Sequence, residues 1–171
     1  GGQTHDFQNA ALMSQSGMTW VKFQLKWSTD SQPSEISERL GRAKAAGFNV
    51  LVSVTGDPYP TSIDYAAFTQ FMGGLASLSP APDAIEVWNE MNIDFEWPAG
   101  QIDPALYTEQ MLAPAYQAIK AANPNIMVIS GAPAPTGFDN GTNAWANSRY
   151  MNGMVAAGAI NYMDCIGVHF N

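Results

Sequence analysis

The chain has 171 residues and a formal net charge of −8, from 7 Lys and Arg against 15 Asp and Glu. This length fits one domain of roughly 100 to 200 residues, or part of a barrel of about 250. Hydrophobic residues make up 46% of the chain and charged residues only 13%, so it can bury a sizeable core. The negative charge repels nucleic-acid phosphates and anionic membrane surfaces, so we expect neither as a partner.

The composition also bears on metal sites, membrane segments and location. The one cysteine, Cys165, cannot form an internal disulfide, and no Cys and His cluster has the spacing of a structural zinc site. No apolar run approaches the roughly 18 residues that span a bilayer. We therefore expect no metal, no cofactor and no membrane segment. Few lysines, five tryptophans and an acidic balance are typical of secreted proteins that handle polysaccharides, so we expect an extracellular or periplasmic protein. Its signal peptide is not among these residues.

Short apolar runs alternate with longer helix-like segments, which predicts a parallel α/β architecture. After a helix expected over 6–18, the segment 19–27 (TWVKFQLKW) alternates apolar and polar residues, as a strand with two different faces does. A parallel strand covered by helices on both faces would be apolar throughout. A barrel strand instead turns apolar residues to its outer helices and can carry polar ones inside. The pattern therefore favours a barrel.

The remaining elements repeat a βα unit of roughly 30 residues. Local chemistry marks their ends: Ser34 and Asp103 are expected N-caps, Asp64 opens a helix, Gly47 stops one, and Pro114 predicts a kink. Helices are expected at 34–46, 64–78, 103–122 and 148–157, and strands at 48–55, 84–89, 126–130 and 165–170. We therefore predict a single domain over 1–171, a (β/α)8 TIM barrel that is incomplete in this chain, with about strands one to six present.

The strongest chemical signal lies at the end of the fourth expected strand, where reactive groups of such barrels gather. Trp88-Asn89-Glu90 sets an amide and a carboxylate side by side next to an aromatic ring. A partly desolvated carboxyl group can hold a proton at neutral pH and give it to a leaving oxygen. The neighbouring amide can hold a sugar hydroxyl, although an asparagine here can also end a strand by bonding its own backbone.

These residues resemble the retaining glycoside hydrolases of clan A, (β/α)8 barrels whose fourth strand ends in an Asn-Glu pair; families 5 and 39 look closest. Segments 19–23, 121–130 and 166–170 are similar to the family's second, fifth and sixth strand regions, so the resemblance covers nearly the whole chain. It implies that a β-linked poly- or oligosaccharide is cleaved by double displacement. In that mechanism Glu90 is the general acid/base and Asn89 holds the 2-hydroxyl of the substrate.

Retention needs a second carboxylate about 5 to 5.5 Å from the first, acting as nucleophile. In clan A this is a Glu at the end of strand seven, so we expect it beyond residue 171. Asp57, Asp94 and Glu96 lie in loops after strands three and four without a nucleophile motif. A non-catalytic carbohydrate-binding or scaffold protein built from a degenerate barrel is the alternative hypothesis. The sequence does not predict an oligomeric state.

Further residues are candidates for binding the substrate. Aromatic rings stack on sugar faces, so aromatic residues at strand ends or in βα loops are expected platforms. These platforms are Trp27, Tyr59, Trp97 and Trp145, and the polar candidates are Lys26, His5, Asn92 and His169. The polar residues have structural alternatives, since a lysine can be merely solvated and a histidine can cap a helix or belong to the core. Glu86 is expected to pair with Lys22 in a structural role.

Overall fold

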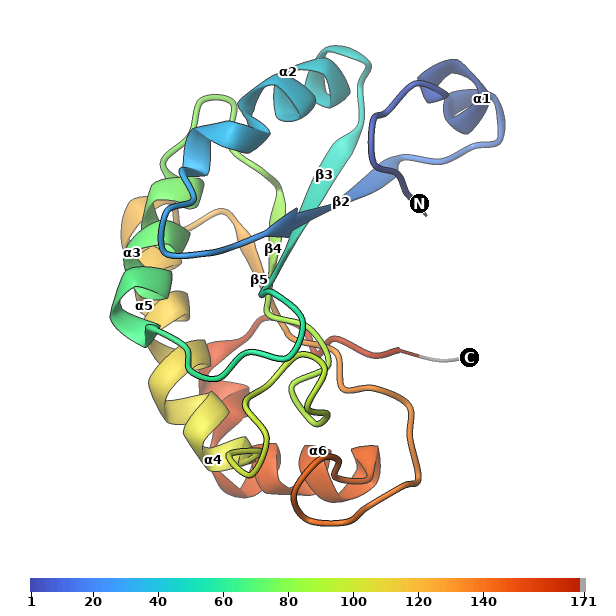
Figure 1. The fold of residues 1–171 in the computed structure, drawn as a ribbon. Helices are drawn as coiled ribbons and strands as arrows, with labels where there is room; N and C mark the ends of the chain where they lie inside the picture. The colour runs from blue at the N-terminus through green and yellow to red at the C-terminus, as the bar shows by residue number, and fades with distance from the viewer. Residues whose placement is uncertain (170–171) are drawn as a thin grey trace.

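Five parallel strands form one open sheet in the computed structural model, which describes residues 1–169 (Figure 1). The strands are β1 (Gly2–Gln3), β2 (Trp20–Lys26), β3 (Asn49–Thr55), β4 (Ala84–Val87) and β5 (Met127–Ser130). Each strand pairs with the next in sequence, in the spatial order β1-β2-β3-β4-β5. Sequential parallel pairing of this kind builds the wall of a βα barrel. The predicted parallel α/β architecture is confirmed, and the wall does not close within the described residues.

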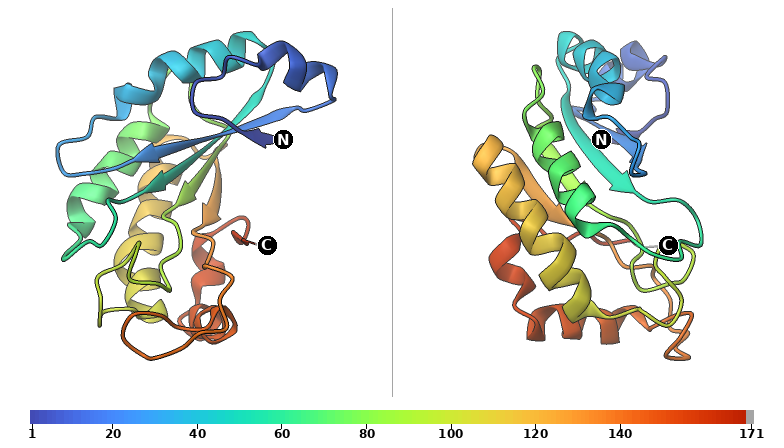
Figure 2. Two further views of the ribbon diagram at one scale, coloured as in Figure 1. Left: turned by 45° about the vertical axis from the view of Figure 1, so that its right-hand side comes forward. Right: turned by 60° about the vertical axis from the view of Figure 1, so that its left-hand side comes forward.

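Helices connect the strands and cover the convex side of the sheet. They are α1 (Ala10–Gln15), the 3-10 helix η1 (Pro33–Ile36), α2 (Ser37–Ala45), α3 (Tyr65–Ala76), α4 (Pro104–Leu106), the π-helix η2 (Tyr107–Leu112), α5 (Ala113–Ala122), α6 (Asn147–Ala156) and the 3-10 helix η3 (Ala159–Tyr162). Figure 2 shows α3 and α5 side by side along this face, with α2 at the top of both views. None of the helices in residues 1–169 is long and apolar enough to cross a membrane.

Local chemistry sets some of the helix ends as predicted. The side chain of Asp103 accepts a hydrogen bond from the main-chain N–H of Ala105 (2.8 Å), so this N-cap is confirmed; at the start of α3, Asp64 likewise accepts one from Ala67 N–H (2.9 Å). The N-cap predicted at Ser34 is wrong, because Pro33 takes the first position of η1 and Gln32 caps it, which leaves Ser34 inside the helix. Where Pro114 predicted a kink, the preceding turn η2 has the wider π-helical register. Such a turn suits a proline because the proline brings no N–H to the helix ladder.

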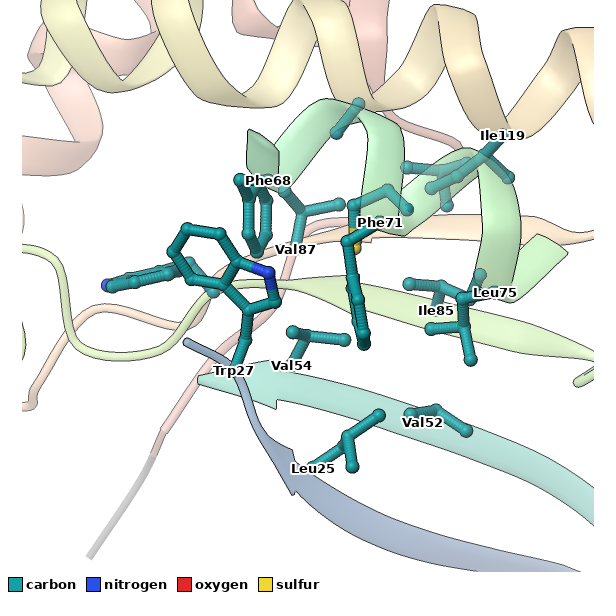
Figure 3. Packing of buried hydrophobic residues seen from close by; sticks show 14 of the residues in the cluster. Leu25, Trp27, Val52, Val54, Phe68, Phe71, Leu75, Ile85, Val87 and Ile119 are labelled. Atoms are coloured by element: carbon teal, nitrogen blue, oxygen red, sulfur yellow. The ribbon is translucent and has the colours of Figure 1, made fainter. Parts of the chain in front are cut away.

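The core lies between the sheet and the convex-side helices. Phe23, Val52, Ile85 and Val128 stand in register across β2 to β5, and each is fully buried. Figure 3 shows Val52 and Ile85 of this row on the side of the sheet that helices α3 and α5 cover, with Phe71, Leu75 and Ile119 packed over them. This row explains the apolar half of the alternation in β2.

The polar half of the alternation faces the concave side. Lys22 Nζ lies 2.6 Å from Glu86 Oε2, which confirms the expected pair between β2 and β4. A mostly apolar hollow of about 420 Å³ lies on the same side, lined by residues that include Trp20, Leu51, Ala84, Met127 and Ile129. The concave side therefore combines a buried ion pair with an apolar hollow.

Three predicted boundaries are wrong for local reasons. Helix α1 does not begin at residue 6, because Phe7 has φ +56° and buries its ring against Phe23 and Phe48. Strand β4 stops at Val87 because Trp88 has φ +75°. In place of a strand over 165–170, the described residues give one parallel bridge, from Cys165 to Ile129. Two residues after Cys165, the N–H of Gly167 donates to the Ser130 hydroxyl (3.0 Å) and not to a main-chain carbonyl of β5, so the ladder of strand hydrogen bonds ends there. Phe170 lies outside the described residues.

Candidate active site

The turn that follows β4 holds Glu90 in an unusual backbone conformation. Trp88 and Glu90 have φ values of +75° and +41°, in the left-handed region that L-residues other than glycine rarely adopt. Such residues cost roughly 1 to 3 kcal/mol each and gather at functional sites. The main-chain N–H of Glu90 donates to Ala132 O at 2.9 Å, which ties this turn to the segment after β5. Packing around the turn therefore fixes where the Glu90 side chain begins.

Glu90 and His169 meet although they are 79 positions apart in sequence. Glu90 Oε1 lies 2.9 Å from His169 Nδ1, and the two side chains are 25% and 29% exposed. Nδ1–H of the ring donates to an ionised Glu90, and an unprotonated Nδ1 accepts from a protonated one. The contact joins the turn after β4 to the segment after Cys165, which is bridged to β5, at the carboxyl edge of the sheet. It brings together two of the predicted site residues and leaves both in reach of solvent.

Asn89 is buried beside a carboxylate that the sequence analysis set aside. Its Nδ2 donates to Glu96 Oε1 at 3.1 Å, and Glu96 is also buried. The pKa of Glu96 is raised from 4.5 to about 7, mainly by burial. The hydrogen bond from Asn89 and the charges of Lys26 and His169 act in the opposite direction, and the charge of Glu90 adds to the rise. A carboxyl group that is half protonated near neutrality is typical of functional sites.

Glu96 was missed because its loop position carries no motif. The only local signal is an acidic residue between two aromatic ones, Phe95 and Trp97. The main chain explains how it reaches Asn89: the N–H groups of Glu96 and Trp97 both donate to Ile93 O, at 3.2 and 3.1 Å. This tight turn carries the loop back toward the end of β4.

Trp27 and Trp97, two of the predicted sugar platforms, are buried in this structure. Trp27 is only 6% exposed, and Trp97 is fully buried. Both rings pack edge-on against Trp88, with centroids 6.2 and 6.1 Å away. The Trp97 indole N–H donates to Gln101 O at 2.8 Å. These rings form a buried aromatic layer under the Glu90 turn, and Trp97 offers no free face to a ligand.

Tyr59 does present an exposed ring near this edge of the sheet. It is 66% exposed and packs edge-on against Phe95, which is 40% exposed, with centroids 5.1 Å apart. The Tyr59 N–H donates to Phe95 O at 2.8 Å, which joins the two loops. Beside Tyr59 lies a hollow of about 380 Å³ that is also bordered by Trp27, Asp57 and Trp88. The sequence analysis did not predict Phe95 as a substrate-binding residue.

The side chain of Asn92, one of the predicted substrate-binding residues, holds two loops together. Its side chain is fully buried and makes its hydrogen bonds to the loop after β5. Nδ2 donates to Ala134 O (3.1 Å) and Trp145 O (3.0 Å), and Oδ1 accepts from Ala134 N (2.6 Å). Trp145 itself is half-buried, and the Arg149 guanidinium lies over its ring, 3.5 Å from the centroid. One face of that indole is therefore covered.

The remaining candidates lie on the surface. Lys26 is exposed at the end of β2 and forms an ion pair with Asp57 at 3.0 Å. His5 is exposed just after β1; its main-chain O accepts from Arg39 Nη1 at 3.3 Å, and no described contact joins its ring to Glu90. Within residues 1–169, no group of three or more His, Cys, Asp or Glu side chains is placed to hold a metal ion.

Comparison with known proteins supports the fold assignment. No protein-family model and no curated protein sequence matches the chain. Among solved structures, the Ignisphaera aggregans GH53 catalytic domain matches 99% of this chain with a TM-score of 0.65 at 20% identity, and the chain covers 55% of that domain. The catalytic domain of GH30 xylanase C from Talaromyces cellulolyticus matches 98% with a TM-score of 0.58 at 11% identity, and 51% of it is covered.

At these identities the similarity shows the fold alone, and the chain spans about half the length of both domains. Both neighbours are catalytic domains of clan A glycoside hydrolases. The chain therefore has a glycosidase-like α/β fold, with a barrel wall that is not closed in this chain.

Proposed function

We propose that the protein is a retaining glycoside hydrolase in which Glu90 is the general acid/base. The observation that carries this proposal is the Glu90 carboxylate itself, held on a strained turn at the end of β4 and 2.9 Å from His169 Nδ1. Catalytic groups of (β/α) barrels lie at this edge, and the glycosidase-like fold supports the same chemistry.

In the first step, the protonated Glu90 gives its proton to the oxygen of the leaving sugar while a carboxylate attacks the anomeric carbon. In the second step, the ionised Glu90 takes a proton from the water that releases the bound sugar. His169 steadies the Glu90 side chain in both protonation states, because its ring nitrogen can donate or accept. Asn89 uses one N–H for Glu96 and keeps its second N–H and its carbonyl oxygen for the 2-hydroxyl of the sugar.

The nucleophile of this proposal comes from outside residues 1–171. Glu96 does not suit the role, because it is buried and a pKa of about 7 leaves half of it protonated near neutrality. A nucleophile must carry its negative charge when the substrate binds. A glutamate at the end of a seventh strand, as in the clan A resemblance, remains our proposal.

The proposed substrate is a β-linked poly- or oligosaccharide. The exposed ring of Tyr59, which packs against Phe95, borders a hollow at the edge that carries Glu90, and this suits a sugar stacked on an aromatic face. The GH30 neighbour is named a xylanase, so β-xylan belongs among the first polymers to try.

The test compares the full-length protein with its Glu90→Gln variant on a panel of β-linked glycans. We expect the variant to lose about 100-fold or more in turnover on unactivated glycans, a typical contribution of general acid–base catalysis. The loss of turnover should be smaller on a dinitrophenyl glycoside, because dinitrophenolate leaves without being protonated. Glu109→Gln, the same change at an exposed site on η2, is the control.

Unimpaired turnover by Glu90→Gln on an unactivated glycan would overturn the role of Glu90. If wild type and variant bind glycans equally and neither turns them over, the non-catalytic carbohydrate-binding hypothesis is supported instead.

A further inference from the structure

Glu96 is a buried carboxylate for which the proposed reaction has no use. It is 8% exposed, and its Oε1 accepts a hydrogen bond from Asn89 Nδ2 at 3.1 Å. Burying a carboxylate is costly unless it has partners, and most acidic residues stay in water for that reason. A buried carboxylate bonded to the neighbour of Glu90 therefore calls for an explanation.

The main chain clamps Glu96 in this place. The indole N–H of Trp88 donates to Glu96 O at 2.8 Å, and the N–H of Glu96 donates to Ile93 O at 3.2 Å. Trp88 is itself fixed, because its ring is 1% exposed and packs between those of Trp27 and Trp97. The buried aromatic layer thus fixes the main chain from which the Glu96 side chain reaches Asn89.

The bond decides which end of the Asn89 side chain faces the site. An amide can turn by 180° and exchange its oxygen for its nitrogen. An ionised carboxylate only accepts, so it holds the Nδ2 end and directs Oδ1 away from itself. A protonated Glu96 can also donate, and it then accommodates either orientation. The ionised form of Glu96 therefore selects one orientation of the group next to Glu90.

We infer that Glu96 is a positioning residue, which orients the Asn89 amide beside Glu90 for contact with a hydroxyl group of the sugar. The inference rests on the proposed function for the identity of that hydroxyl, the 2-hydroxyl. The charged groups that act on Glu96 are Glu90, Lys26 and His169, and burial dominates over all of them. Because the pKa of Glu96 is about 7, its hold on Asn89 is strongest above neutrality and relaxes in mild acid.

The test uses the full-length protein with an aryl β-glycoside and its 2-deoxy analogue. Glu96→Met removes the acceptor at similar size. We expect it to lower kcat/KM about 10- to 100-fold on the 2-hydroxy substrate and less than about threefold on the 2-deoxy one, because a misplaced amide matters only where there is a hydroxyl to hold. Asn89→Ala should show the same selectivity, and the double variant should be no worse than Asn89→Ala alone.

Glu96→Gln is the conservative variant and guards against a merely structural effect. The glutamine amide can accept from Asn89 Nδ2 or donate to Asn89 Oδ1, as a protonated Glu96 can, so the kcat/KM of this variant should match that of the wild type in mild acid. The titration that Glu96 contributes near pH 7 should disappear from the pH profile. Glu109→Gln again serves as the control, and thermal unfolding of each variant shows that it has folded.

Two results separate failure of this inference from failure of the proposed function. Suppose that Glu90→Gln is inactive, while Glu96→Met lowers kcat/KM equally on the 2-hydroxy and 2-deoxy substrates or leaves it unchanged on both. The inference is then wrong and the proposed function stands. If no glycan is cleaved, NMR still tests the pair: the Asn89 side-chain amide signals should move with a midpoint near pH 7 in wild type and stay still in Glu96→Gln. If the Asn89 amide signals follow the same pH dependence in wild type and in Glu96→Gln, the inference is overturned without reference to activity.

Discussion

The pKa of Glu96 makes a definite prediction about stability. In the folded protein burial raises it from its ordinary value of 4.5 to about 7, so between these pH values the folded state holds a proton that the unfolded chain releases. The free energy of unfolding therefore falls as pH rises from 4.5 to 7, and this contribution levels off above 7. The interval corresponds to about 3 kcal/mol, at about 1.4 kcal/mol per pH unit.

Glu96→Gln isolates this contribution because it keeps the size and the acceptor oxygen while removing the charge. Near pH 5, where Glu96 is protonated in the folded state, variant and wild type should be about equally stable. At pH 8 the wild type must bury a charge that the variant lacks, so the variant should be more stable by up to about 3 kcal/mol. The pKa values of Asp139 and Asp164 are lowered from 3.8, so their titration falls outside this window.

The assay is urea unfolding followed by tryptophan fluorescence at pH 5, 6, 7 and 8, with linear extrapolation to water. Glu109→Gln should differ from wild type by an amount that does not change over this range. A stability difference between Glu96→Gln and wild type that stays flat from pH 5 to 8, or grows toward acid, would refute the reasoning. It would mean that Glu96 titrates near its ordinary value and that burial does not govern it.

Three further outcomes are expected. Asn92→Asp should destabilise the fold by about 3 kcal/mol at pH 7, since a carboxylate would face two carbonyl oxygens; an unchanged midpoint of thermal unfolding would contradict this. Gly131→Ala should cost about 1 to 3 kcal/mol in urea unfolding, because its Cβ would lie 2.9 Å from Val87 O, while Gly137→Ala, with open space around it, should cost little. Tyr59→Ala should weaken oligosaccharide binding about 3- to 10-fold by calorimetry with no change in stability, given its exposure; loss of stability without loss of affinity would argue against a platform.

The sequence predicts well what short-range chemistry controls. The alternation along 19–27 predicted a two-faced strand, and the structure places Phe23 in the core and Lys22 against Glu86. The N-cap at Asp103 is equally local, because its side chain binds N–H groups two and three residues away. The position of Glu90 just past β4 follows from the same counting of strand ends.

Only the tertiary structure decides which loop residues face the site. Asn92 and Trp97 looked like ligand groups by type, yet both are buried, because hydrogen bonds to the loop after β5 hold one and aromatic packing holds the other. Glu96 looked like an ordinary loop acid, yet a turn at Ile93 and the left-handed backbone of Trp88 bring it to Asn89. Burial and long-range contact are properties of the packed chain, so the pattern of residue types that determines strands and caps does not determine them.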